Sequence, residues 1–449
     1  MQFACCFRAD RAIPGRFGIR ILSVLGRVVW LIGLCCCGSH VPAGEPPNIV
    51  LILADDLGWN DVSYHGGVIP TPNIDRFVGE GIELDRFYVA PYCVPTRAGL
   101  LTGRYPHRFG IPSQANLGRK HFVPTEAVTF AEVLAEAGYA RRACIGKWHL
   151  GDEDGQRPLD QGFNRFYGLL GGMVDYFDHR TIPFGRNAAN RPRLLDWHRG
   201  EDDCDDEGYS TDLIGTESVR FIAESAAQQP FLMYAAFNAP HLPLQAKSKG
   251  RPGPEDSRAL FTGDAATNRA IYAEMVSSLD ENVGRILDAI DQNGLREETL
   301  VLFLSDNGGV SKFGIGDNSP LRGGKNTVWE GGIRVPAAIR WPAAWEGGRR
   351  LAEPIAFVDV LPTLAHIAAA TDLPDTIDGQ DVSEILGQPR SDLDRQLYVG
   401  PLAIVGKRWK LVGEALFQIA DDPGETSDVA ALYPDVVESL KAELAAFSQ

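Results

Sequence analysis

The sequence predicts an α/β protein with one large central β-sheet flanked by helices, followed by a smaller C-terminal antiparallel sheet with a helix. Apolar runs of strand length alternate with amphipathic helical patterns, and this alternation gives way to short strands and tight turns near the C-terminus. A chain of 449 residues is longer than one compact core usually needs. We therefore expect a large α/β domain over residues 44–385 and a small α+β subdomain over 386–449.

Four apolar runs carry the prediction of the large sheet. Each is continuous rather than alternating, which is typical of strands buried on both faces. Each also ends in polar, ionisable residues, and ligands gather outside the carboxyl ends of such strands. The runs are NIVLILADD (48–56), ARRACIGKWHLG (140–151), PFLMYAAFNAPH (230–241) and TLVLFLSDNGG (299–309). Four such ends point to one shared site.

Helical patterns lie between these runs. The segments 129–138 and 273–294 are amphipathic, and each closes on a glycine that suits a helix C-cap. The stretch 245–268 is polar and rich in Pro and Gly, so we expect a surface excursion there. The acidic run 201–208 is predicted to be a solvated loop, with a cation site as the alternative.

The C-terminal pattern is different. Residues 396–425 indicate short strands joined by tight turns, and residues 432–447 indicate a helix. This pattern predicts a small antiparallel sheet with one helix packed on the main domain.

The first 43 residues predict a secretory signal peptide. Five arginines precede a short apolar run at 28–38, and Val41 and Ala43 have the spacing of a cleavage site. The apolar run is too short to span a membrane, although an uncleaved anchor is the alternative. We expect export to the periplasm or the extracellular space, with no stable membrane span after cleavage.

Five of the eight cysteines leave with this leader. Cys93, Cys144 and Cys204 remain, and three cysteines are not a disulfide framework. A Cys144–Cys204 pair is possible, and Cys93 would then be the odd thiol. The formal charge of −16 argues against a nucleic-acid partner, because phosphate backbones require clustered Lys and Arg.

Two of the strand ends offer oxygen ligands for a metal ion. Asp55, Asp56, Asp306 and Asn307 provide three carboxylates and an amide carbonyl. Such a set suits Ca²⁺ or Mg²⁺ rather than zinc. The alternative is that Asp55 and Asp56 only cap a helix beginning near Leu57.

Other residues could act on an anionic substrate. Arg97, Lys147 and Lys325 are candidate ligands for an anionic group, and His149 and His241 could act as acid or base. His65, His107, His179 and Trp197 could line the pocket, and each could equally be structural.

Cys93 stands at the predicted start of a short helix. Pro95 suits the first turn of this helix and Gly103 its end, so the backbone N–H groups there favour an anion or a thiolate. A cysteine nucleophile is the plain interpretation. However, a thiolate matches a Ca²⁺ site poorly, since hard cations prefer oxygen.

The motif CVPTRAGLLTGR (93–104) resembles the signature of the type-I sulfatases, whose cysteine in C-x-P-x-R is oxidised to Cα-formylglycine. Further blocks resemble the same family in the same order, and several are most similar to the arylsulfatase B (N-acetylgalactosamine 4-sulfatase) branch. The blocks are LADDLGWNDV, AEAGYARRACIGKWHLG, LLGGMVDYFDH, NAPHLPL, LSDNGG and PLRGGKNTVWEGGIRVP. This resemblance implies the mixed-sheet fold of the alkaline phosphatase superfamily.

The resemblance also implies roles for individual residues. Asp55, Asp56, Asp306 and Asn307 would hold one Ca²⁺ ion, together with formylglycine derived from Cys93. The gem-diol of this formylglycine, positioned by Arg97, would attack sulfur. Lys147 and Lys325 would bind sulfate oxygens, His241 with Lys325 would protonate the leaving alcohol, and His149 would act as the later base.

The implied partners are a sulfated carbohydrate and a formylglycine-generating maturation enzyme. N-acetylgalactosamine sulfate in a glycosaminoglycan, or an algal glycan, is the expected type of substrate. A formylglycine-dependent phosphate or phosphonate ester hydrolase and a catalytically silent glycan-binding protein are the alternatives. Two-zinc phosphatases of this superfamily differ, since they use Ser or Thr nucleophiles and additional His and Asp ligands.

Overall fold

The computed structural model describes residues 45–111, 123–182, 192–249, 260–261, 264–388 and 393–447. The chain divides into residues 1–40 and 41–449, and all described residues belong to the second unit. The predicted signal peptide lies outside the described residues, as does most of the predicted excursion after Lys249.

A ten-stranded mixed sheet runs through the described part of the main domain. Its strand order is β11-β2-β10-β9-β1-β8-β4-β5-β6-β7. In that order the strands are Arg349–Leu351, Ile82–Leu84, Ala337–Arg340, Thr299–Ser305, Asn48–Ala54, Phe231–Ala236, Arg141–Lys147, Arg165–Leu169, His198–Arg199 and Asp202–Asp203. The α/β prediction is confirmed.

The four strands predicted from apolar runs are neighbours at the centre of this sheet. β1 pairs in parallel with β9 on one side and β8 on the other, and β8 pairs in parallel with β4. Their carboxyl ends therefore lie at one edge of the sheet. The expectation of one shared site is met by this arrangement.

The outer strands make the sheet mixed. β10 is antiparallel to both β9 and β2, and β6 is antiparallel to β5. A separate two-stranded sheet pairs β3 (Phe87–Tyr88) with β12 (Ile355–Ala356). These short strands have no long apolar run in the sequence.

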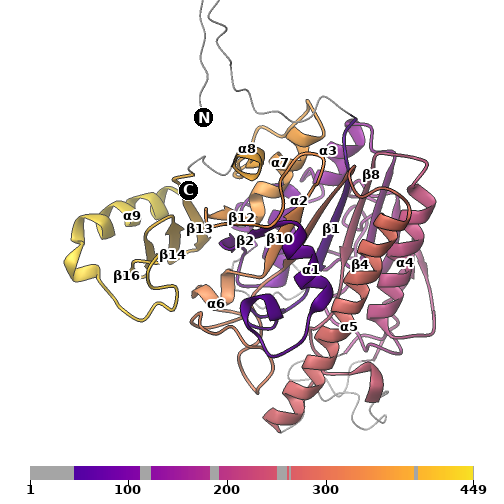
Figure 1. The fold of residues 1–449 in the computed structure, drawn as a ribbon, viewed down its shortest axis with the longest axis horizontal. Coiled ribbons are helices and arrows are strands. Elements are labelled where there is room, and N and C mark those ends of the chain that lie inside the picture. The colour runs from indigo at the N-terminus through magenta and orange to yellow at the C-terminus, as the bar shows by residue number, and fades with distance from the viewer. Residues whose placement is uncertain are drawn as a thin grey trace, which may run out of the picture. The chain divides into compact units, whose positions relative to one another are not determined.

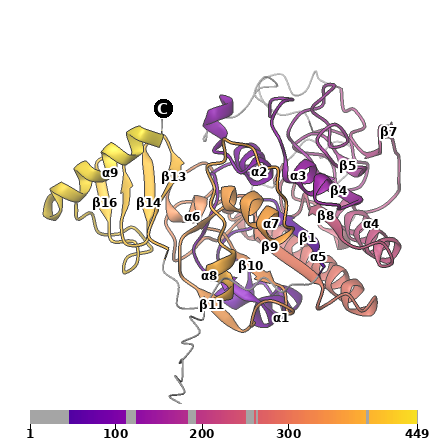
Figure 2. The same cartoon turned by 90° about the horizontal axis from the view of Figure 1, so that it is seen from above.

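Helices cover both faces of the large sheet (Figures 1 and 2). One apolar core joins the sheet to α2 (Cys93–Thr102), α3 (Phe130–Glu136) and α7 (Val360–Ile367). The other joins it to α1 (Pro72–Glu80), α4 (Ser210–Ser225) and α5 (Ala265–Gln292). Successive residues of β1 alternate between the two cores, as a strand buried on both faces requires.

The two predicted helices are present with shifted bounds. Thr129 caps α3 in a capping box with Glu132, so the helix begins at Phe130. α5 begins eight residues before the predicted start of 273, because Asp264 provides the N-cap. The surface excursion predicted over residues 245–268 therefore ends before Ala265, earlier than predicted.

The C-terminal part forms a four-stranded antiparallel sheet in the order β13-β14-β15-β16. The strands are Gln396–Gly400, Ala403–Gly406, Lys410–Val412 and Ala415–Phe417, and α9 (Pro434–Phe447) packs on them. Two further helices are short: α6 (Glu330–Ile333) lies in the chain between β9 and β10, and α8 (Ser383–Gly387) between α7 and β13. Among the described helices, none is long and apolar enough to cross a membrane.

Candidate active site

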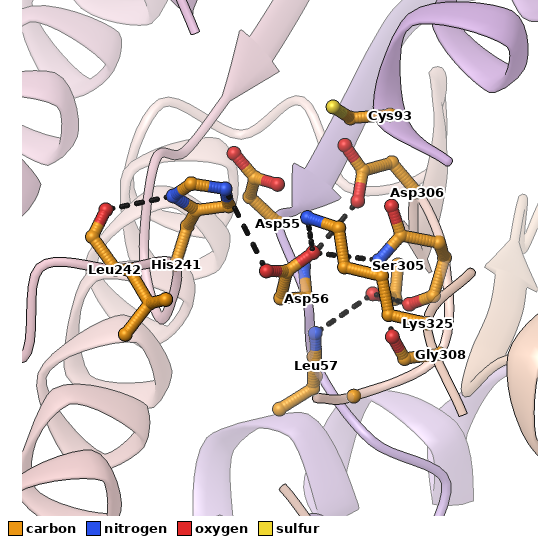
Figure 3. Close-up of polar contacts among 12 residues, drawn as sticks. Asp55, Asp56, Leu57, Cys93, His241, Leu242, Ser305, Asp306, Gly308 and Lys325 are labelled. Atoms are coloured by element: carbon orange, nitrogen blue, oxygen red, sulfur yellow. Dashed lines mark hydrogen bonds and ion pairs between the residues drawn. The ribbon is translucent and has the colours of Figure 1, made fainter. Parts of the chain in front are cut away.

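The predicted oxygen ligands meet at the carboxyl ends of β1 and β9. Ala54 and Ser305 are register partners, so Asp55 and Asp56 emerge beside Asp306 and Asn307. All four side chains are buried. The Asp56 N–H donates to Asp306 Oδ1 over 3.3 Å, and Asn307 Nδ2 donates to Asp56 Oδ1 over 2.6 Å (Figure 3). Residues 57–62 are not helical, so the helix-cap alternative is wrong.

Three cationic side chains surround these carboxylates. Lys147 Nζ pairs with Asp55, and Lys325 Nζ lies 2.5 Å from Asp56 Oδ1. Arg97 contacts both groups: its Nη2 lies 2.9 Å from Asp306 Oδ2, and its Nη1 donates to the Lys147 carbonyl over 2.8 Å. The structure therefore brings together all three predicted cations.

Burial and neighbouring charges shift the pKa values of Asp55 and Asp306 in opposite directions. Burial alone would raise the pKa of Asp55, but Lys147, His241 and Arg97 outweigh it and hold that pKa below its usual range. Burial and the negative charge of Asp55 raise the pKa of Asp306 to about 7. Three carboxylates, Asp55, Asp56 and Asp306, and three cations are therefore crowded into one buried cluster.

The donor set fits a hard cation. Within the described residues, Asp55 Oδ1 and Asn307 Oδ1 are buried acceptors without a hydrogen-bond partner. Asp55, Asp56 and His241 also offer ligand atoms that all lie within 4.8 Å of one another. Buried acceptors that lack donors are expected where a cation binds, and carboxylate and amide oxygens favour Ca²⁺ or Mg²⁺.

Cys93 is the first residue of α2, as predicted, and Gly103 ends this helix in the left-handed conformation. The thiol is buried, and this burial raises its pKa. Cys93 Sγ lies 3.4 Å from His149 Nδ1. A thiol with a raised pKa is a weak nucleophile at neutral pH, because the thiolate is the reactive form.

The two histidines contact different residues of the site. His149 is partly buried, and burial together with Lys147 and Arg97 lowers its pKa well below the usual value. His241 Nδ1 lies 2.7 Å from the Leu242 carbonyl, so this nitrogen carries a proton and donates it (Figure 3). His241 Nε2 faces Asp56 Oδ2 at 3.7 Å. Burial lowers the pKa of His241 to about 4.

Three non-glycine residues of the site adopt a left-handed backbone. Asp56, His149 and Asn326 have φ values of 68°, 62° and 76°. Such conformations are costly and persist where surrounding contacts impose them, often at functional sites. Asn326 follows Lys325 directly, and its N–H donates to the Pro91 carbonyl two residues before Cys93.

Sequence reasoning missed two neighbours of the site. Tyr92 has its ring centroid 5.8 Å from Lys325 Nζ. A Cβ added to Gly172 would lie 2.4 Å from the His149 ring, so only a glycine fits there. The position of Tyr92 beside Cys93 was the available signal, whereas nothing in the sequence linked Gly172 to His149.

The other candidate pocket residues have packing partners away from the acidic cluster. His65 stacks on Trp59, His107 Nε2 binds the Phe447 carbonyl, and His179 stacks on the buried Trp197. The acidic run 201–208 contains the exposed strand β7. Cys144 and Cys204 are both free thiols, so the possible pairing between them is not formed.

Comparison with known proteins identifies the family. A family profile described as Sulfatase matches residues 47–370. This chain belongs to the sulfatase family. Its fold and motifs place it among the type-I sulfatases of the alkaline phosphatase superfamily, which are sulfuric ester hydrolases.

Curated relatives carry sulfatase names. The chain is 34% identical over 364 residues to arylsulfatase J of Mus musculus, a match covering 77% of this chain and 57% of the relative. It is 34% identical over 390 residues to N-acetylgalactosamine-6-sulfatase of Canis lupus familiaris, covering 81% of this chain and 69% of the relative. The chain thus spans little more than half of arylsulfatase J.

One similar protein has been solved both alone and with a bound oligosaccharide. The crystal structure of Ps i-CgsB is 34% identical, with a TM-score of 0.77 over 90% of this chain and 93% of that one. The same protein has been solved in complex with k-i-k-neocarrahexaose.

Proposed function

We propose that this protein hydrolyses sulfate esters of a carbohydrate, with formylglycine formed from Cys93 and one Ca²⁺ ion. The observation that carries this proposal is the buried cluster in which Cys93, two lysines, two histidines and the oxygen ligands meet at one edge of the sheet. The names of the relatives and the carbohydrate bound to Ps i-CgsB support the substrate class. N-acetylgalactosamine sulfate in a glycosaminoglycan, as for an arylsulfatase B-like enzyme, or an algal polysaccharide is the proposed type.

Asp55, Asp56, Asp306 and Asn307 would hold Ca²⁺, and position 93 would complete the set. The bound ion would supply further positive charge to a buried site where three carboxylates lie close together. Formylglycine at position 93, hydrated, would supply an oxygen nucleophile that also suits a hard cation. The raised pKa of the Cys93 thiol supports the view that an unmodified cysteine is not the nucleophile.

The lysines would bind the sulfate group. Acidic neighbours, Asp56 foremost, outweigh the effect of burial and raise the pKa of Lys325, so its ammonium group is fully charged at neutral pH. Together with Lys147, it would stabilise negative charge that develops on the sulfate oxygens. Arg97, bound to Asp306 and to the Lys147 carbonyl, would fix the positions of the helix that carries residue 93 and of the strand end that carries Lys147.

The histidines would move protons. His241, with Lys325, would protonate the departing alcohol, and a bound sulfate would favour its charged form by offsetting the lysines that lower its pKa. His149 has Nδ1 beside residue 93 and a strongly lowered pKa, so it is neutral at pH 7. A neutral imidazole at this position is suited to accept a proton from the residue 93 side chain.

We further propose that residues 1–43 direct export to the periplasm or the extracellular space and are then removed. Residues 44–385 would form the catalytic domain and residues 386–449 the C-terminal subdomain. A formylglycine-generating enzyme would be the maturation partner.

The direct test is an assay for released sulfate. The protein would be produced with a formylglycine-generating enzyme, supplied with Ca²⁺ and offered sulfated galactosamine oligosaccharides and sulfated algal galactans. We expect sulfate release by the wild type and none by Cys93→Ala. Faster hydrolysis of matched phosphate or phosphonate esters would make the protein a phosphoester or phosphonate hydrolase. Glycan binding without turnover by fully modified protein would indicate a binding protein.

A further inference from the structure

Asp196 joins two parts of the chain near the candidate active site. Its Oδ1 accepts the Leu170 N–H and its Oδ2 accepts the Gly171 N–H, each over 2.9 Å. These two residues follow directly after β5, and the Asp196 side chain is nearly buried. Two backbone donors on one carboxylate fix the start of the loop at residues 170–172 in place.

The same loop contacts His149 twice. The His149 N–H donates to the Leu170 carbonyl over 3.0 Å. The loop also passes so close to the imidazole that a Cβ on Gly172 would lie 2.4 Å from its Nε2 and Cε1. The other ring nitrogen, Nδ1, lies 3.4 Å from Cys93 Sγ. The loop therefore limits how far the ring can move.

The backbone of His149 is itself in an uncommon conformation. Its φ of 62° is in the left-handed region, which non-glycine residues adopt at a cost and keep where surrounding contacts hold them. The loop lies against Cε1 and Nε2 of the ring, and residue 93 lies near Nδ1. A small displacement of the loop would move Nδ1 relative to residue 93.

His198 in turn orients Asp196. Its Nε2 lies 3.2 Å from Asp196 Oδ1 and its Nδ1 lies 3.2 Å from Asp203 Oδ1. The Asp203 side chain is 70% exposed. Unlike Asp196, it forms no hydrogen bond or ion pair with the 170–172 loop among the described residues. Asp203 therefore offers a control that shares the histidine partner but lacks the loop contact.

We propose that Asp196 is a positioning residue for His149, acting through the loop at residues 170–172. This inference rests on the proposed function, since it assigns His149 a role in proton transfer at residue 93. Among the described residues, no hydrogen bond or ion pair joins Asp196 to the acidic cluster or to Cys93, so its effect on turnover is indirect. The two glycines make the arrangement possible, because a Cβ on Gly171 would lie 2.5 Å from Asp196 Oδ2.

The test compares Asp196→Asn with Asp203→Asn in the full-length, modified, Ca²⁺-loaded enzyme on a chromogenic aryl sulfate. Asn at position 196 keeps one acceptor and loses the other. We expect kcat to fall by about 10- to 100-fold and KM to fall with it, so that kcat/KM is unchanged, because misplacing a catalytic group by about 1 Å has this scale of effect. His149 acts after the alcohol has left, so the first turnover should stay fast and appear as a burst of released phenol. Asp203→Asn should behave like the wild type.

A second variant tests the packing contact without touching Asp196. Gly172 does not have a positive φ, so Gly172→Ala adds only a methyl group toward the His149 ring. It should reproduce the loss in kcat and the burst. Wild-type kcat in Gly172→Ala, or a raised KM with unchanged kcat in Asp196→Asn, would overturn the proposal.

Amide hydrogen exchange separates this inference from the proposed function. Without any substrate, the amides of Leu170 and Gly171 should exchange faster in Asp196→Asn than in the wild type or Asp203→Asn. Unchanged exchange would overturn the inference even in an active enzyme. A wild type that releases no sulfate would instead overturn the proposed function, while the exchange result would still show whether Asp196 holds the loop.

Discussion

The carboxylate of Asp56 faces three other residues of the site. Lys325 and Asn307 contact its Oδ1, and His241 faces its Oδ2 at 3.7 Å. Its backbone is left-handed. These contacts tie together residues that are up to 269 positions apart in the sequence. A change at any one of them alters the surroundings of the others.

The proposed acid role of His241 predicts a loss that depends on the leaving group. For a sugar sulfate, whose alcohol needs a proton to leave, His241→Ala should lower kcat by about 10²–10⁴-fold. For an aryl sulfate with an acidic phenol the loss should be much smaller. The measurement is kcat for both substrates in the wild type and the variant. Equal losses on the two substrates would contradict the role.

The proposed Ca²⁺ site predicts a stability effect that needs no activity assay. Chelation should lower the unfolding temperature, and Ca²⁺ at about 100 times its Kd should restore roughly 2.7 kcal/mol of stability. Asp306→Asn should remove this response, because it takes one charged ligand from the set. Scanning calorimetry with and without Ca²⁺ measures the effect. A Zn²⁺ response in place of the Ca²⁺ response would contradict the oxygen-ligand assignment.

At the scale of elements, a buried charge cluster links the C-terminal sheet to the segment that carries Lys325. Lys410 of β15 lies 2.9 Å from Glu330 Oε1 and 2.7 Å from Glu425 Oε1, and all three side chains are buried. The Glu330 N–H also donates to Glu425 Oε2 over 2.7 Å. Glu330 begins α6, five residues after Lys325. The cluster therefore holds this segment against the C-terminal sheet.

Removing the central cation of this cluster should be strongly destabilising. Lys410→Met leaves two buried carboxylates without their partner, and we expect about 3–5 kcal/mol less stability in urea unfolding. The double variant Lys410→Met, Glu425→Gln should recover part of this loss. Lys441→Met is the control, because its partner Glu414 is highly exposed and the pair should contribute less than about 1 kcal/mol. A loss of that small size at Lys410 would contradict the account.

The elements that could be predicted were those with a local signal. Continuous apolar runs predicted β1, β4, β8 and β9, and their polar ends predicted which side chains meet. The short strands β2, β10 and β11 were not predicted, because runs of three or four residues carry too little periodicity. Asp196 and Gly172 were missed for another reason: their roles depend on contacts between loops that tertiary packing alone brings together.

At the scale of the whole molecule, the large sheet brings the site residues together at one edge. The apolar cores on the two faces of the sheet hold the strand ends in place. Polar groups buried in these cores make stability depend on pH. His179 is fully buried, stacks on Trp197 and has a pKa lowered by burial. In the unfolded chain the same histidine titrates near its ordinary pKa of about 6.5. The unfolded state therefore binds more protons than the folded state below this pH.

This difference predicts a loss of stability in acid. The contribution of His179 is fully present above about pH 6.5 and is lost as the pH falls toward its lowered folded-state pKa. His179→Asn, which suits the left-handed backbone at φ 53°, should be less stable at pH 7.5 but lose less stability between pH 7.5 and 5.5. Urea unfolding of the Ca²⁺-loaded proteins at both pH values measures this, and identical pH dependence in wild type and variant would refute it.

The central claim is that residue 93 is a formylglycine in the active protein. Mass spectrometry of the tryptic peptide 87–97, FYVAPYCVPTR, tests it most directly, in protein produced with a formylglycine-generating enzyme. We predict loss of the thiol sulfur, gain of an aldehyde that a carbonyl reagent traps, and sulfate release in proportion to the modified fraction. An intact cysteine in a preparation that still releases sulfate, under conditions that fully convert a control sulfatase, would contradict the account.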